Sequence, residues 1–87
     1  MQLAHIVIEL DPRDDYPRFR AELRTRGGDE LLTQSNLRRR RSTQGYIVTL
    51  EIPASRLAAG EYELALVGMR DGAPAEELSY SYFSVRR

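Results

Sequence analysis

Eighty-seven residues are enough for one small domain with a single core, and too few for two. The chain is 41% hydrophobic and 30% charged, a balance that excludes a disordered tail, a collagen-like repeat and a coiled coil. Its 13 basic side chains, all arginine, equal its 13 acidic ones, so no net charge attracts nucleic acid or an anionic membrane, and any such attraction must be local.

The side chains that most catalytic and metal sites require are scarce. The chain has no cysteine and one histidine, which excludes thiol catalysis, disulfides, Cys/His zinc sites and iron–sulfur clusters within it. No serine lies in a nucleophile-elbow motif, and His5 is the one imidazole that could act as a base for a serine. We therefore expect no catalytic residue, no metal and no cofactor, and we interpret His5 as an ordinary strand residue.

Apolar and polar side chains alternate along most of the chain, the period of strands with one buried face. The expected strands span residues 5–10, 18–24, 30–34, 46–52, 62–68 and 78–85. Residues 35–44 are polar and arginine-rich, and they predict a loop or a frayed edge strand. We expect one all-β domain over residues 1–87. It would be an immunoglobulin- or fibronectin-III-like antiparallel sandwich of six to seven strands, with one helical turn near residues 53–58.

One hairpin turn and the orientation of the last strand follow from particular residues. Gly27-Gly28-Asp29 supplies the positive φ angles of a tight hairpin between the second and third strands. In the last strand Phe83 and Val85 are expected to face inward, but Tyr80 and Tyr82 compete for that face. A bulge would reconcile the two registers.

A short pattern between the expected strands at residues 46–52 and 62–68 predicts a tyrosine corner. Leu57 would fill the core beneath the turn, Gly60 would turn the chain, and Tyr62 would bury its ring while its hydroxyl bonds backbone a few residues upstream. The pattern is typical of sandwiches in which the chain crosses from one sheet to the other.

Several of these segments together resemble a known bacterial domain. They are residues 16–23, 27–29, 50–57, 60–64 and 82–85. The chain is similar to the C-terminal extracytoplasmic β-sandwich domain of membrane-anchored zinc-finger and anti-sigma-factor-like proteins, whose last strand commonly has tyrosine where this chain has Ser81. The resemblance implies a location in the periplasm or cell envelope, and membrane attachment only through a segment absent from this chain. The 87 residues themselves contain no signal peptide pattern and no run of eighteen apolar residues.

Two charged clusters are candidate binding sites. Arg38, Arg39, Arg40 and Arg41 form a run whose guanidinium groups could bind phosphate or sulfate of a nucleic acid, lipid headgroup or glycan. A solvated loop or a charged edge strand is the alternative.

The second cluster is acidic. Asp11, Asp14 and Asp15 follow the first strand, where three carboxylates could bind calcium, but the spacing lacks the glycine and distal glutamate of known calcium loops. We therefore interpret these aspartates as turn caps.

Tyr80 and Tyr82 are the candidate partner surface, because tyrosines on the outer face of a last strand form a flat amphipathic patch. An ordinary role as strand residues is the alternative. The leading hypothesis is a non-catalytic interaction or sensing module with a protein partner. The alternative is an anion-binding domain that uses Arg38 to Arg41. The oligomeric state stays open.

Overall fold

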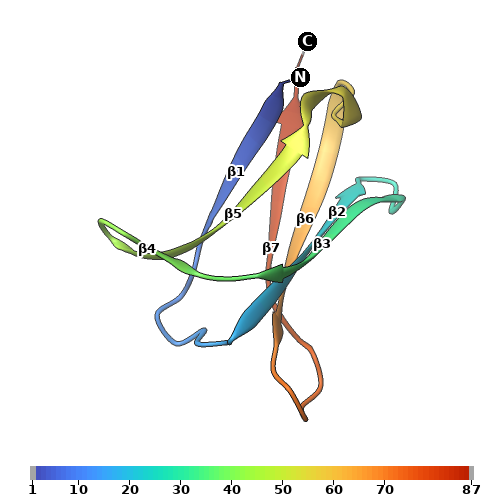
Figure 1. Cartoon of the computed structure of the whole chain (residues 1–87). Helices are drawn as coiled ribbons and strands as arrows, with labels where there is room; N and C mark the ends of the chain where they lie inside the picture. The colour runs from blue at the N-terminus through green and yellow to red at the C-terminus, as the bar shows by residue number, and fades with distance from the viewer. Residues whose placement is uncertain (1, 87) are drawn as a thin grey trace.

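The computed structural model describes residues 2–86 as two antiparallel β-sheets packed face to face (Figure 1). The strands are β1 (Leu3–Glu9), β2 (Arg18–Thr25), β3 (Glu30–Leu37), β4 (Arg40–Ser42), β5 (Gly45–Pro53), β6 (Gly60–Met69) and β7 (Glu76–Val85). The smaller sheet has the order β1-β5-β4 and the larger one β3-β2-β6-β7. A single 3-10 turn, η1 (Ala54–Arg56), connects β5 to β6. The predicted all-β sandwich with one short helical turn is therefore confirmed.

The core lies between the two sheets and comes mainly from three central strands. Alternate residues of β2, β5 and β6 point inward, as their period of two requires. The inward residues are Phe19, Ala21, Leu23, Val48, Leu50, Ile52, Tyr62, Leu64 and Leu66, each less than 5% exposed. Ile8 of β1 joins them. Burial of this apolar surface is what holds the two sheets together.

The segment at residues 35–44 is mostly edge strand and not a loop, which is the second of the two predicted alternatives. β3 continues to Leu37, and β4 begins at Arg40, so most of residues 35–44 are paired strand. The chain passes here from the larger sheet to the smaller one, as the green ribbon of Figure 1 shows, and Asn36 takes a left-handed φ of 60° at the bend. The crossing closes this side of the sandwich, where the Gln34 side-chain amide donates a hydrogen bond to the Glu51 carbonyl at 2.8 Å.

The last strand contains a bulge, but it lies before Ser79 and not between the two tyrosines and Phe83, so it does not bring Tyr80 and Tyr82 to the inner face. Phe83 lies opposite buried Tyr62, so both side chains share the inner face, while Tyr80 and Tyr82 point outward. The register shifts between Leu66 and Val67, which leaves Leu78 without a partner residue on β6. The extra residue allows the alternation of β7 to change phase.

The hydrogen bond predicted for Tyr62 is present at the η1 connection. The Tyr62 hydroxyl donates to the Ala58 carbonyl at 2.5 Å, and its ring stacks on Phe83 with a centroid distance of 5.4 Å. Leu57 is buried beneath the turn. Gly60 has a φ of 152°, a conformation that side chains with a Cβ rarely adopt. This corner ties the crossing between the sheets to the core.

Candidate interaction site

Two tyrosines of β7 stand on the outer face of the larger sheet. Tyr80 is 45% exposed and Tyr82 is 63% exposed. The Tyr80 hydroxyl donates a hydrogen bond to the Glu77 carboxylate, and the Arg26 guanidinium lies 5.5 Å from the centroid of the Tyr82 ring. Both rings are therefore held by a charged neighbour while one side stays open to solvent.

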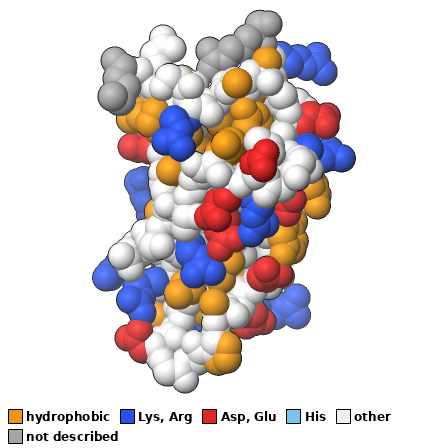
Figure 2. All heavy atoms as spheres, turned by 90° about the vertical axis from the view of Figure 1, so that its right-hand side faces the viewer, with side chains coloured by type: hydrophobic (Ala, Val, Ile, Leu, Met, Phe, Trp, Pro, Cys, Tyr) orange, Lys and Arg blue, Asp and Glu red, His pale blue; other side chains and the backbone are white. Residues whose placement is uncertain are grey.

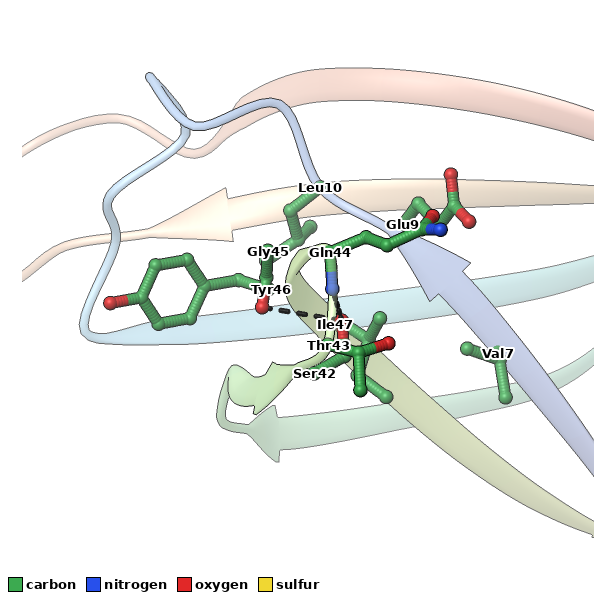
Figure 3. Close-up of a pocket in the computed structure, with 9 residues that line it drawn as sticks. All are labelled: Val7, Glu9, Leu10, Ser42, Thr43, Gln44, Gly45, Tyr46 and Ile47. Carbon is green, nitrogen blue, oxygen red and sulfur yellow. Dashed lines mark hydrogen bonds between the residues drawn. The ribbon is translucent and has the colours of Figure 1, made fainter.

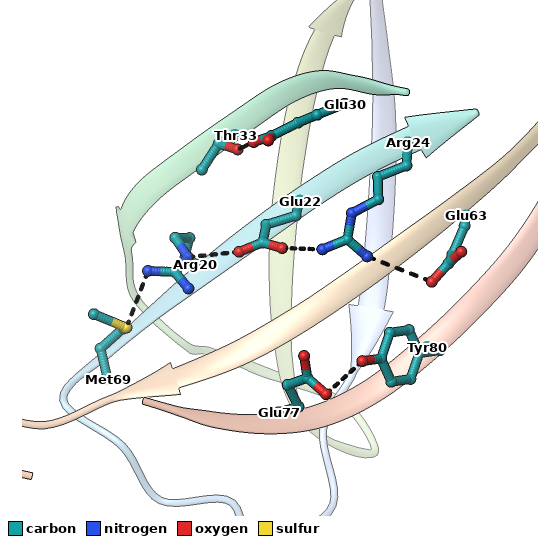
Figure 4. A network of polar contacts seen from close by, with 9 residues as sticks. All are labelled: Arg20, Glu22, Arg24, Glu30, Thr33, Glu63, Met69, Glu77 and Tyr80. Carbon is teal, nitrogen blue, oxygen red and sulfur yellow. Dashed lines mark hydrogen bonds and ion pairs between the residues drawn. The ribbon is translucent and has the colours of Figure 1, made fainter. Parts of the chain in front are cut away.

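Beside these tyrosines runs a chain of paired charges (Figure 4). Arg20 Nε lies 2.9 Å from one Glu22 oxygen, Arg24 binds the other, and Arg24 Nη1 reaches a Glu63 oxygen at 3.5 Å. The side chains lie over the outward Ala65 of β6, which is buried although it faces away from the core. Figure 2 shows acidic and basic groups side by side across the middle of the face that it presents. Because the charges neutralise one another, this network offers no basic patch for nucleic acid.

The exposed large hydrophobic side chains of residues 2–86 lie on two edge strands, one in each sheet, and two of them, Val7 and Tyr82, line the same groove between these strands. Tyr80 and Tyr82 belong to β7, while Leu3 and Val7, 43% and 58% exposed, belong to β1. β1 and β7 are edge strands of the two sheets, and they flank the side of the sandwich opposite the β3–β4 crossing. The sequence reading singled out the two tyrosines but not Leu3 and Val7. The sequence contained a signal for Val7, because it is an apolar residue on the same strand face as the polar residues His5 and Glu9.

The arginine run does not converge on one site. Arg40 lies opposite Ile47 and Arg41 opposite Tyr46, so their side chains leave β4 on opposite faces. Arg39 pairs with Asp15 at 3.2 Å and stacks on the Tyr46 ring at 4.0 Å. Arg38 and Arg40 line one shallow pocket that also contains Glu51, so these two could contact the same anion.

The acidic cluster behaves as a capped turn. Asp11 accepts a hydrogen bond from the Arg13 backbone N–H at 2.9 Å and pairs with the Arg13 guanidinium. The side-chain hydrogen bond from Arg13, followed by the backbone one, holds the pKa of the Asp11 carboxyl below its usual value. Asp15 turns instead toward Arg39. In residues 2–86 no three acidic or histidine side chains gather into a group able to hold a metal ion.

Among the interactions of residues 2–86, His5 has a carboxylate neighbour and no nucleophile as partner. His5 Nδ1 lies 3.6 Å from Glu51 on the exposed outer face of the smaller sheet. A separate pocket of about 270 Å³ lies at the β4–β5 hairpin, lined by Ser42, Thr43, Gln44 and the start of β5 (Figure 3). The Ser42 hydroxyl there bonds the Gly45 carbonyl, an arrangement that stabilises the hairpin.

No known family model, curated protein or solved structure matches this chain. Within residues 2–86 no helix has the length and apolarity needed to cross a membrane.

The contact between Tyr80 and Glu77 should affect the pKa of the Tyr80 hydroxyl. The neutral phenol donates to a carboxylate, so ionisation would place two negative charges together, and this hydrogen bond raises the pKa of Tyr80. The contact stabilises the fold at pH values below the unfolded-state pKa of about 10, and this contribution is lost as pH rises through the higher folded value. We expect Glu77→Gln to lower the pKa of Tyr80, measured by NMR titration of the ring carbons.

A matched control exists at Glu76, the residue before Glu77 in β7. The Tyr16 hydroxyl bonds Glu76, which likewise raises the pKa of Tyr16. Glu76→Gln should therefore lower the pKa of Tyr16 and leave Tyr80 unchanged. If Glu77→Gln left the pKa of Tyr80 unchanged, the hydrogen bond between the two side chains would be contradicted.

Proposed function

We propose that this protein is a non-catalytic interaction module that binds a protein partner along the side of the sandwich formed by β1 and β7. The observation that carries the proposal is that exposed Val7 of β1 and exposed Tyr82 of β7 line one groove between these two edge strands. Exposed apolar side chains concentrated in one place are typical of protein-binding surfaces, in which tyrosine is enriched. The neighbouring charge network is internally paired, which favours a protein over a polyanion as partner.

The strand order supports an immunoglobulin-like reading of the sandwich. In immunoglobulin domains one sheet has the order A-B-E-D and the other contains C-F-G, with a hydroxyl-bonded tyrosine at the E–F connection. Here β1-β5-β4 corresponds to B-E-D, β3-β2-β6-β7 to C′-C-F-G, and Tyr62 follows the connection from β5 to β6. Folds of this class serve widely as binding modules, although the fold alone does not specify a partner.

The proposed setting is the bacterial cell envelope. The segments that resemble extracytoplasmic domains of membrane-anchored zinc-finger and anti-sigma-factor-like proteins support this setting. A domain in that position would receive its partner from outside the cytoplasm.

Site-specific photo-crosslinking tests the proposed surface. A benzophenone amino acid is introduced at position 82, or at position 55 on the exposed η1 turn as a control. We expect one protein to be crosslinked from position 82 and not from position 55. The double variant Val7→Thr with Tyr82→Thr keeps strand-forming residues, and we expect it to weaken the affinity for that protein at least ~tenfold.

The control for this double variant is Ser35→Thr with Ser55→Thr, two exposed positions away from β1 and β7. It should bind the crosslinked protein as the parent does. Equal crosslinking from positions 82 and 55, or an affinity that the Val7 and Tyr82 changes leave intact, would contradict the proposal.

A further inference from the structure

The β1–β7 side of the sandwich contains an apolar groove of about 460 Å³. Ile6 and Ile8 of β1 form one wall, and Leu64 and Phe83 form the floor. The other wall comes from Ser79 and Ser81 of β7, which lie opposite Leu66 and Leu64 and so share the core-facing side. Ser81 is exposed even though it faces inward. Two small polar residues thus stand where a closed sandwich would have large apolar ones.

Backbone groups of β1 are available along this groove. The Leu10 N–H bonds the Tyr46 carbonyl at 3.0 Å, and the Ala54 N–H bonds the Gln2 carbonyl at 2.9 Å. Even-numbered residues of β1 therefore direct their backbone groups toward β5, and the odd-numbered ones direct theirs to the opposite edge. Since β1 is the last strand of its sheet, the N–H and C=O groups of His5, Val7 and Glu9 face the open side.

The two sides of the sandwich differ in how they are closed. On the β3 side, the chain itself crosses between the sheets, and Arg56 adds a hydrogen bond to the Leu31 carbonyl at 2.7 Å. On the β1–β7 side no segment of residues 2–86 crosses. In the correspondence with immunoglobulin domains β1 is strand B, so the open edge beside β1 is the position of strand A.

We propose that the groove receives an extended segment of a separate polypeptide, which adds to β1 as an antiparallel strand. Its alternate apolar side chains fill the space over Leu64 and Phe83, and its backbone pairs with His5, Val7 and Glu9. This mode deepens the proposed function and depends on it. Strand addition uses main-chain hydrogen bonds for affinity and pockets for alternate side chains for specificity.

A second copy of this chain does not fit the groove. Its own β1 places Ile8 in its own core, so the inward side chains of a paired β1 are already used. The occupant must therefore bring free apolar side chains. Glu9 is the charged residue lining the groove, at the end where β1 stops, so a basic residue at the amino end of an antiparallel segment complements it.

The test uses a synthetic peptide with this chemistry, acetyl-Lys-Thr-Val-Thr-Val-Thr-Val-Thr-amide, added to the isotope-labelled 87-residue protein. Amide hydrogen exchange is measured by NMR with and without the peptide. We expect at least ~tenfold slower exchange at His5, Val7 and Glu9. The amides of Ile6 and Ile8, already directed to β5, should change little. A peptide of the same composition with its three valines consecutive should give no protection.

Two variants separate the groove from the outer face of the same strand. Ser81→Arg places a long charged side chain into the groove and should abolish protection by the peptide. Ser84→Arg makes the same change on the outward side of β7, opposite Glu61, and should leave protection by the peptide intact. Val7→Pro removes the central free N–H without removing a bond to β5, and it also should abolish protection, which keeps the test valid if Ser81→Arg fails to fold.

Three outcomes overturn the inference. The first is no protection in the folded parent protein, and the second is protection at β3 or β4 instead. The third is concentration-dependent protection of His5, Val7 and Glu9 without peptide, which would show that a second copy occupies the edge. If the peptide fails while the Val7 and Tyr82 changes still weaken partner binding, strand addition is wrong and the proposed function stands. If those changes also have no effect, the proposed function fails too.

Discussion

Replacing Phe19 by alanine is expected to lower the free energy of unfolding by about 3–5 kcal/mol. Phe19 is fully buried between the sheets and packs edge-to-face against Tyr16, with ring centroids 6.0 Å apart. The substitution removes the ring's buried apolar surface and leaves a cavity that the surrounding strands only partly fill. Because small domains have a total stability of about 5–15 kcal/mol, this loss removes a large share of it, and Phe19→Ala should unfold at a much lower urea concentration than the parent.

The measurement is urea unfolding followed by circular dichroism, with the stability of each variant extrapolated to water. Tyr82→Ala is the control, because it removes an aromatic ring of similar size from the exposed face of β7. Its effect should stay within about 0.5 kcal/mol. If both substitutions changed stability equally, Phe19 would not lie in the core and Tyr82 would not lie outside it.

Replacing Tyr62 by phenylalanine is expected to cost about 1–2 kcal/mol. The ring and its stacking on Phe83 are kept, so the change isolates the hydroxyl that donates to the Ala58 carbonyl. That carbonyl loses its hydrogen-bond donor, and the phenylalanine ring buried beside it offers no replacement. The loss loosens the connection at which the chain passes between the sheets, so thermal unfolding should begin at a lower temperature.

Tyr80→Phe provides the comparison for Tyr62→Phe. Its hydroxyl also has a partner, Glu77, but the contact is exposed to solvent, so water can replace it. We expect Tyr80→Phe to change the free energy of unfolding by a few tenths of a kcal/mol at most. Its thermal midpoint should then lie within about two degrees of the parent's. Unfolding of Tyr62→Phe at the parent's temperature would show that the corner contributes nothing.

Most of the fold could be predicted because its determinants are local. The alternation around Phe19, Leu50 and Leu64 marks strands with one buried face, and Gly28, with a φ of 96°, marks the hairpin that follows β2. The Leu57–Tyr62 spacing predicted a hydroxyl bond that is present. The segment at residues 35–44 was harder. Its pairing depends on which sheet each half joins, and no local pattern encodes that choice.

The candidate site could be predicted only in part. Tyr80 and Tyr82 were identified from composition and position, and their outward orientation follows from the unbroken alternation that places Phe83 on the inner face. The arginine run looked like a single feature in the sequence, yet strand alternation and the Asp15 contact separate its members. The importance of Val7 depends on β1 being an edge strand, which follows from the order of the sheet.

The amino-acid sequence alone determined that this protein is a sandwich of short antiparallel strands, because alternation and turn chemistry act over a few residues. The tertiary structure decided which strands lie at the edges, which side the crossing chain closes, and that a groove remains between β1 and β7. These features depend on contacts between residues far apart in the chain. Ile6 and Phe83 form one groove only after both sheets have assembled around the same core.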